Sequence, residues 1–358
     1  MRTLSLIAIT SLLALSSLAQ AQTYGLQEGT PELKSIGPLA FGPDGILFVG
    51  DPIGAQVFAI QTGDKDGDAN GASYDIDGLS AKIAAALDGS GDVRIHDLAA
   101  NPATGNLYVS VTRGPTPSLI TISGGGIAKF ALDGVAFAKA ELSNPVPNAV
   151  TGEGRRRANK RGQSITDLAY MNGELVVSGL SGDQDNPSMV RSLVFPFSKV
   201  DKGAPLEIYH GAHGRWENYA AAQAFVPMII DGEPNLLAGF VCTPLVKFPL
   251  SKISSQEPIK GTTVAELGNR NKPLDMIVYE KDDNRWILMA NTARGVMKIS
   301  TSNLDRAEGI TDRVGGGGTA GQEYKTIEAL EGTVQLDKLN DTHAVVIKGD
   351  HLMSVELP

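Results

Sequence analysis

Two histidines separated by two residues are the strongest candidates for chemistry in this 358-residue chain. His210 and His213 lie in the segment Tyr-His-Gly-Ala-His-Gly-Arg-Trp-Glu, which ends at Glu217. Imidazole and carboxylate groups are ligands for zinc, and three protein ligands with one open position are typical of catalytic zinc. His96, from another part of the chain, is the predicted third ligand. Such a centre would activate water or polarise a carbonyl. The alternative is that these histidines only form hydrogen bonds in turns.

Three aspartates recur at one position of a repeated pattern. Asp97, Asp167 and Asp275 each precede the apolar residue on which the repeats align, and the other repeats have Pro38, Gln223 and Gln335 there. Because side chains alternate along a strand, these residues share a direction. Converging carboxylates would suit a hard cation such as calcium, or would act as acid and base. The alternative is that each aspartate accepts backbone N–H bonds at its own strand.

Three further segments carry reactive or charged residues. Residues 66–77 match a calcium loop at positions 1, 3, 5 and 6, with Asp77 at position 12, or form an acidic insertion rich in turns. The basic segment 155–161 would attract an acidic polysaccharide or a phosphorylated ligand, or is a solvated loop. Cys242 is the single cysteine, so no intrachain disulfide is possible, and its apolar neighbours favour a packing role.

Six copies of a strand-turn-strand unit must position these residues. The predicted hairpins span residues 39–50, 98–110, 168–178, 224–239, 276–291 and 336–349, each around a Gly, Asn, Asp or Pro turn. A third strand is predicted after each hairpin, at 57–60, 129–132, 194–197, 247–250, 297–299 and 354–357. A period of tens of residues with such units predicts an all-β, six-bladed β-propeller that forms a single domain over residues 22–358.

Four-stranded blades are predicted, with fourth strands at 137–142, 206–209, 262–267 and 325–330. The last unit has no fourth strand of its own. We therefore predict that the N-terminal segment 23–26 supplies it and closes the ring. Apolar residues at helical spacing over 79–87 predict one short helix that decorates the first unit.

Residues 1–21 predict a Sec-type signal peptide, because a basic start and an apolar run from Leu4 to Leu18 precede Ala-Gln-Ala. We expect export to the periplasm or the cell exterior. No later segment predicts a membrane span. The net charge of −9, without a broad basic stripe, argues against nucleic acid as a partner. The glycine run at 315–318 lacks the Lys and Ser/Thr of a phosphate loop, and no nucleotide or organic cofactor is indicated.

The turn Phe-Gly-Pro-Asp-Gly at 41–45, followed by Ile-Leu-Phe-Val-Gly-Asp, resembles the six-bladed superfamily of NHL-repeat, SMP-30/gluconolactonase-like and strictosidine-synthase-like proteins. The chain is also similar in texture to uncharacterised secreted bacterial propellers. The resemblance implies that the innermost strands line a central channel and that the loops entering them build one rim. The lactonase-like metal site has a Glu, two Asn and an Asp. Asn291 and Asp275 are possible equivalents, Asp51 would have to be the acidic partner, and the set is incomplete.

Two classes of function follow. The first is binding of a small molecule, glycan or protein at the channel rim. The second is metal-dependent hydrolysis of an ester or lactone, or elimination, with calcium or zinc at the channel mouth. The second class would use His96, His210 and His213 as ligands, Asp97, Asp167 and Asp275 as acid and base or for a second cation, and Arg113, Asn291 and Arg294 for an anionic substrate. We favour binding, because no motif identifies a reaction. The sequence does not predict an oligomeric state.

Overall fold

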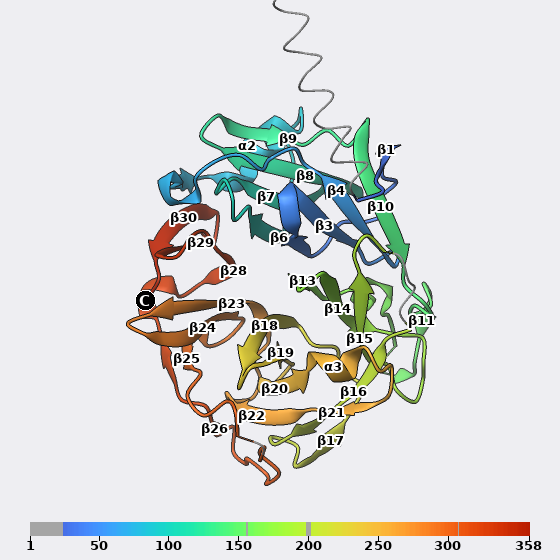
Figure 1. Ribbon diagram of the computed structural model, residues 1–358, viewed down its shortest axis with the longest axis vertical. Coiled ribbons are helices and arrows are strands. Elements are labelled where there is room, and N and C mark those ends of the chain that lie inside the picture. The colour runs from blue at the N-terminus through green and yellow to red at the C-terminus, as the bar shows by residue number, and fades with distance from the viewer. Residues whose placement is uncertain (1–23, 155–156, 198–201, 307) are drawn as a thin grey trace, which may run out of the picture.

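Turn pairs that favour positive φ angles produce the hairpins of this chain. Asn172 and Gly173 have φ angles of 52° and 86°, and Asp231 and Gly232 have 50° and 76°. Both pairs adopt the left-handed backbone that two-residue hairpin turns require. The computed structural model describes residues 24–154, 157–197, 202–306 and 308–358, and in it six hairpins form the inner strands of a six-bladed β-propeller (Figure 1). The predicted signal peptide lies outside the described residues.

The blades are antiparallel sheets, named here in chain order. Blade 1 contains β2 (Leu39–Phe41), β3 (Ile46–Asp51) and β4 (Gln56–Gln61). Blade 2 contains β6 (Val93–Ala100), β7 (Leu107–Arg113), β8 (Thr116–Ser123) and β9 (Gly126–Lys129). Blade 3 contains β13 (Asp167–Met171), β14 (Glu174–Leu180), β15 (Ser188–Val194), β16 (Ala204–His210) and β17 (Arg215–Glu217).

The second half of the chain follows the same plan. Blade 4 contains β18 (Ala224–Ile230), β19 (Glu233–Gly239), β20 (Pro244–Pro249), β22 (Thr262–Glu266) and β26 (Ala320–Gly321). Blade 5 contains β23 (Pro273–Lys281), β24 (Asn284–Asn291), β25 (Gly295–Ser300) and β27 (Tyr324–Thr326). Blade 6 contains β28 (Thr333–Lys338), β29 (His343–Lys348) and β30 (His351–Glu356).

The blades do not follow the ring in chain order. The inner strand β2 packs against β6 on one side and β13 on the other, while β6 also packs against β28. The order around the ring is therefore blade 6, 2, 1, 3, 4 and 5, as Figure 1 shows. Blade 1 separates blade 2 from blade 3, although blades 2 and 3 are consecutive in the sequence.

This order changes two strand assignments. The strand predicted at 137–142 exists as β10 (Val135–Glu141), but it pairs with β4 of blade 1 instead of completing blade 2. The short strand β1 (Gln27–Gly29) pairs with β10 at the outer edge of the same sheet. In blade 2 the third strand is β8, and in blade 3 it is β15, which ends at Val194, so the third strands predicted at 129–132 and 194–197 are wrong. The chain crosses the outside of blade 1 on its way to blade 3, and β10 forms there.

The ring is not closed by the N-terminal segment at 23–26, and that prediction is wrong. Blade 6 receives its outer strand from β5 (Asp75–Asp77), which pairs with β30. Tyr74, which precedes β5, is buried and donates its hydroxyl to the backbone oxygen of Gly105, 2.7 Å away, in blade 2. The segment between blades 1 and 2 therefore fastens blade 6 to its neighbour in the ring.

The predicted calcium loop contributes to this closure. Asp68 caps the backbone N–H of Asn70, and Asp75 and Asp77 belong to β5. Asp75 lies 2.6 Å from Nε2 of His351 on the paired strand. The loop therefore ends in a closing strand, which fits the alternative of a turn-rich insertion.

Helices only decorate the propeller. The helix predicted at 79–87 exists as α2 (Leu79–Ala86), but it packs against blades 2 and 6 and not against the first unit as predicted, and a second helix, α3 (Leu250–Ile253), follows β20. Leu79 and Ile83 of α2 are fully buried among apolar residues of blades 2 and 6. No helix in the described part of the chain is long and apolar enough to span a membrane. The remaining short strands are β11 (Val150–Thr151), β12 (Ala158–Asn159) and β21 (Ile259–Lys260).

Candidate functional site

The hairpin formed by β16 and β17 carries both histidines of the His-x-x-His segment. His210 is the last residue of β16 and pairs with Arg215, while Glu217 on β17 pairs with Ile208. Because strand side chains alternate, His210 and Glu217 project from the same face of the hairpin. Tyr209 and Trp216 therefore project from the opposite face, where their rings meet edge to face at 5.8 Å.

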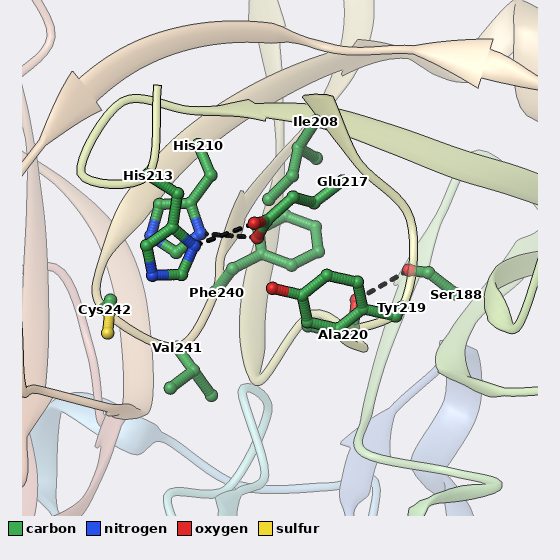
Figure 2. Close-up of a pocket in the computed structure, with 10 residues that line it drawn as sticks. All are labelled: Ser188, Ile208, His210, His213, Glu217, Tyr219, Ala220, Phe240, Val241 and Cys242. Carbon is green, nitrogen blue, oxygen red and sulfur yellow. Dashed lines mark hydrogen bonds and ion pairs between the residues drawn. The ribbon is translucent and has the colours of Figure 1, made fainter. Parts of the chain in front are cut away.

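Glu217 is the centre of this cluster (Figure 2). Its Oε2 atom lies 2.9 Å from Nδ1 of His210, and its Oε1 atom lies 2.8 Å from Nδ1 of His213. Arg215 donates its Nε–H to Oε1 at 2.8 Å. The two imidazole rings are 4.0 Å apart between centroids, with an angle of 41° between their planes. One carboxylate thus orients two adjacent imidazoles.

The electrostatics of the cluster keep Glu217 ionised. Burial would raise its pKa, but hydrogen bonds from Arg215, Tyr219 and the two histidines outweigh burial and hold the pKa at about 2. Burial also lowers the pKa of His210, against the hydrogen bond to Glu217, which raises it. At neutral pH the cluster therefore contains a carboxylate and a neutral His210.

Two neighbouring segments hold the turn between the histidines in place. Glu266 at the end of β22 accepts the backbone N–H of Gly211, and burial raises the pKa of this carboxyl to about 7. Val314, from the segment between β25 and β26, donates its N–H to the backbone oxygen of Gly211 at 2.9 Å. Within the turn, Gly214 donates to the oxygen of His210 at 2.8 Å. The histidines therefore belong to a turn that is supported from two sides.

A small pocket of about 80 Å³ opens in front of these side chains, and we call it the histidine pocket. Figure 2 shows its lining, in which the imidazoles and Glu217 are accompanied by Tyr219, Cys242 and apolar side chains. Ala220 and Val241 line both this pocket and a much larger cavity beside it. A molecule in the larger cavity would therefore lie next to the histidine pocket.

The larger cavity, which we call the funnel, has a volume of about 1090 Å³. Its walls come from all six blades, through the segments that precede each inner strand and through several loops between second and third strands. This arrangement agrees with the rim that the sequence resemblance implies. The inner strands continue from the funnel into a narrower cavity of about 330 Å³, which we call the channel.

The two cavities are lined by different types of ionisable residue. Arg94 and Lys272 are the charged residues that line the funnel, and none of its described lining residues is Asp or Glu. The channel is lined by four aspartates and one lysine, Asp97, Asp167, Asp275, Asp337 and Lys338. The whole chain has more acidic than basic residues, with a net charge of −9. The lining of the funnel therefore differs from the rest of the chain in the sign of its charged residues.

The channel aspartates join neighbouring blades. One oxygen of Asp167 accepts the N–H of Leu168 at 2.7 Å, and the other accepts the N–H of Phe225 in blade 4 at 2.7 Å. Asp275 accepts in the same way from Met276 and from Leu336 in blade 6. This geometry fits the alternative in which the aspartates accept backbone N–H bonds, extended by a bond to the next blade.

Asp97 and Asp337 repeat this arrangement. Asp97 accepts from Leu98 and from Leu39 in blade 1, and Asp337 accepts from Lys338 and from Ala100 in blade 2. Burial raises all four pKa values, and for Asp97, Asp167 and Asp275 the charge of other aspartates raises them further. The pKa of Asp97 rises to about 7 and that of Asp337 to about 6, and those of Asp167 and Asp275 lie well above the usual range.

His96 lies apart from the other two histidines. It is a residue of β6 on the funnel wall, and its Nε2 atom is 3.0 Å from Oγ1 of Thr112. Among the described residues, the one group of three or more His, Cys, Asp or Glu side chains within ligand distance consists of His210, His213 and Glu217. The structure thus brings two of the three predicted ligands together and places Glu217 with them.

The predicted ligand-binding residues take part in local contacts. The side-chain oxygen of Asn291 accepts from Nδ2 of Asn271 at 2.9 Å. Arg294 donates to the backbone oxygen of Asn269 at 3.2 Å. Arg113 lies at the end of β7, outside the residues that line the funnel. These three residues therefore do not converge on one cavity.

Asp51, which the resemblance implied as an acidic metal ligand, and Cys242, the single cysteine, have structural positions instead. Asp51 is fully buried, and its carboxylate accepts the backbone N–H groups of Lys34, Ser35 and Gly54. Cys242 is half-buried in the turn between β19 and β20, where its φ angle is 66°. A positive φ is uncommon for residues other than glycine, so the cysteine there is a backbone exception.

Sequence reasoning missed Asp337 and the role of Glu217. Asp337 lies two residues beyond the aligned position, on the same side of its strand, and only the ring geometry shows that it joins the other three. The signal for Glu217 was present in the alternation Arg-Trp-Glu, which places Arg215 and Glu217 on one face of a strand.

Comparisons with known proteins add little to this geometry. No family model matches the chain, and no curated protein matches it. A PQQ-bound aldose sugar dehydrogenase from Streptomyces coelicolor is 14% identical over 92% of this chain and 96% of that chain, with a TM-score of 0.31. A streptogramin B lyase is 10% identical over 93% and 97%, with a TM-score of 0.36.

A third solved structure has no enzyme in its description. The Cps50 (Swd1) β-propeller domain from Myceliophteria thermophila is 8% identical over 90% of this chain and 84% of that chain, with a TM-score of 0.39. At these low identities and TM-scores, the neighbours carry no argument about activity.

Proposed function

We propose that this propeller binds a ligand in the funnel through an anionic group of that ligand. The observation that carries the proposal is the charge of the cavity, whose charged lining residues are Arg94 and Lys272 and whose described lining contains no carboxylate. In the described part of the chain, neither of these two side chains forms an ion pair. Both are therefore available to an anion.

The shape and lining of the funnel support a small ligand or the end of a chain. A volume of about 1090 Å³ accommodates a molecule larger than a monosaccharide. The wall combines apolar residues with amide and hydroxyl groups, among them Gln163, Thr166, Gln223 and Gln335. Such a lining recognises a partly polar ligand, because a few placed polar groups give orientation and apolar walls give affinity.

A panel of ligands sorted by charge tests the proposal. The purified protein is screened by thermal shift and then by calorimetry against carboxylates, uronic acids and sugar phosphates, with neutral sugars and polyamines as comparison. We expect binding within the anionic group only. The variant Arg94→Glu/Lys272→Glu should weaken that binding at least tenfold. Preferential binding of neutral sugars or polyamines would refute the proposal.

A charge-matched control separates local from overall electrostatics. Lys129 on β9 and Lys325 on β27 are exposed lysines outside the funnel lining. The variant Lys129→Glu/Lys325→Glu has the same net charge as the funnel variant. It should bind the anionic ligand as the wild type does.

The second candidate function is metal-dependent hydrolysis of an ester or lactone, or elimination. The observation in its favour is the contact between the two cavities, since Ala220 and Val241 line both the funnel and the histidine pocket. A metal ion in the histidine pocket would face a ligand in the funnel. In this proposal the channel aspartates serve as joints between blades, because both oxygens of each already accept backbone N–H bonds.

Activity assays test the second candidate. Ester, lactone and elimination substrates with an anionic group are assayed with added Zn²⁺ and with chelator. Turnover that needs the metal and that His210→Ala/His213→Ala abolishes is the expected result. Turnover that persists in that variant would exclude the histidine pocket as its site.

A further inference from the structure

We propose that His210 and His213 bind one divalent transition-metal ion through their Nε2 atoms, with Glu217 as the carboxylate that positions both imidazoles. This inference deepens the second candidate function and is independent of ligand binding in the funnel. It differs from the sequence prediction in two respects. His96 is not a ligand, and Glu217 acts through the histidines.

The hydrogen bonds of Glu217 determine which imidazole nitrogen is free. A carboxylate only accepts hydrogen bonds, and Glu217 also accepts one from Arg215. The two Nδ1 atoms at 2.8 and 2.9 Å must therefore carry the hydrogens. In each neutral imidazole the lone pair then lies on Nε2. Metal-binding histidines usually have this arrangement, in which the other ring nitrogen donates to a carboxylate.

The Nε2 atom of His210 supplies an independent observation. His210 is only 5% exposed, and its Nε2 atom is buried without a hydrogen-bond partner among the described residues. A buried polar atom without a hydrogen-bond partner is energetically unfavourable, so such atoms are rare unless something occupies the space beside them. His210 also lines the histidine pocket, which gives an ion a place to bind.

The spacing of the side chains suits a small ion. The two rings are 4.0 Å apart between centroids, and ligand atoms of His210, His213 and Glu217 lie within 4.8 Å of one another. Two nitrogen ligands of a tetrahedral zinc ion are about 3.3 Å apart. His213 is the more exposed histidine, so its ring has room to rotate and bring the two Nε2 atoms to this separation.

The ligand types select the metal. Two neutral imidazoles suit Zn²⁺, Co²⁺, Ni²⁺ or Cu²⁺, whereas Ca²⁺ and Mg²⁺ require several oxygen ligands. Both oxygens of Glu217 are engaged with the histidines and Arg215. The site therefore has open positions toward the pocket, where water or an anionic group from the funnel would complete the coordination.

The supported turn makes the site stiff enough to bind without large rearrangement. Glu266 and Val314 fix Gly211 from two sides, and Glu217 fixes both rings. A site whose ligands are already oriented loses little conformational entropy on binding.

Metal binding is measured directly, without any assay of activity. The full chain is purified without chelator and without immobilised nickel, and Zn²⁺ binding is followed by calorimetry and by plasma mass spectrometry after dialysis. We expect about one Zn²⁺ per chain. His210→Ala and His213→Ala should each weaken binding at least a hundredfold. Glu217→Gln should weaken it about 10- to 100-fold, because an outer carboxylate tunes its histidine ligands.

The chain offers a matched control. His351 is also a histidine paired with a carboxylate, since its Nε2 atom lies 2.6 Å from Asp75, but it has no second histidine beside it. His351→Ala should leave Zn²⁺ binding unchanged. Circular dichroism and thermal melts of each variant distinguish lost binding from lost folding.

Three outcomes would overturn the proposal. The first is that the wild type binds no Zn²⁺. The second is that folded His210→Ala binds Zn²⁺ as the wild type does. The third is that His351→Ala loses as much affinity for Zn²⁺ as His210→Ala. A loss in folded Glu217→Gln equal to that of His210→Ala would contradict the positioning role and make Glu217 a direct ligand. None of these results affects the funnel, whose ligand binding depends on Arg94 and Lys272.

Discussion

The carboxylate of Asp97 accepts the backbone N–H of Leu39 at 2.7 Å, although Leu39 is 58 residues away and belongs to another blade. The same relation links Asp167 to Phe225 and Asp275 to Leu336. Asp337 adds a fourth link, to Ala100. Four of the six contacts between neighbouring inner strands therefore contain an aspartate joint, and these residues join the blades along the channel.

Removal of one joint should destabilise the whole propeller. Asp97→Ala leaves the N–H groups of Leu39 and Leu98 without their acceptor in a largely buried environment. We expect a loss of about 2–4 kcal/mol in the free energy of unfolding. Asp92→Ala, an exposed aspartate close by in sequence, should change it by less than about 0.5 kcal/mol. Equal effects of the two substitutions in urea denaturation would contradict the role of Asp97.

The joints also predict a pH dependence. Burial raises the pKa of Asp97 to about 7, so between pH 4 and pH 7 the folded state binds more protons at this group than the unfolded state does. The contribution of Asp97 to the free energy of unfolding must therefore be greatest near pH 4 and must fall as the pH rises through 7. Asp337, with a pKa of about 6, acts in the same direction.

Denaturation of wild type and Asp97→Asn from pH 4 to pH 8 measures this effect, because the difference between them isolates the titration of Asp97. The asparagine side chain keeps a similar size but does not titrate in this range. We expect the wild type to lose stability relative to the variant as the pH rises. A difference that is constant with pH, or of the opposite sign, would contradict the raised pKa.

The fold could be predicted from the sequence as far as local patterns determine it. Turn pairs such as Asn172-Gly173 fix the hairpins, and six hairpins imply six blades. The order of the blades around the ring could not be predicted, because the repeats resemble one another and local patterns do not determine which inner strands become neighbours. The crossing segments decide the order, and their strands β5 and β10 join blades that are distant in sequence.

The unpredictable order of the blades also explains why the structure brings His210 and His213 together but leaves His96 apart. His210, His213 and Glu217 come from one hairpin, so their proximity follows from local sequence. His96 comes from blade 2, and blade 1 lies between blade 2 and the blade that carries the hairpin. Its distance from the hairpin depends on the order of the blades, which local sequence does not determine.

Closure of the ring by β5 predicts unequal effects of proline at two similar positions. Ile76 is the middle residue of β5, and Glu28 is the middle residue of β1. Ile76→Pro should destabilise the protein by about 2 kcal/mol or more, because it disturbs the pairing with Leu352 that completes blade 6. Glu28→Pro changes only an outer edge and should cost less than about 1 kcal/mol. A larger loss from Glu28→Pro, in chemical denaturation, would favour closure through the N-terminus.

We expect Lys247 to restrict the motion of the segment between β25 and β27. Its ammonium group is buried and donates to the backbone oxygens of Leu304 at 2.6 Å and of Arg306 at 3.1 Å. Lys247→Met leaves both oxygens without this donor. We expect faster limited proteolysis within residues 301–321, with Lys252→Met, an exposed lysine of α3, as the control. An unchanged cleavage rate in Lys247→Met would show that other contacts hold the segment.

The position of a bound ligand tests the proposed function most directly. A crystal structure of the protein with the tightest anionic ligand from the panel should show the anionic group within hydrogen-bond distance of Arg94 or Lys272 in the funnel. Density for that ligand in the aspartate-lined channel, or at a site outside both cavities, would contradict the account.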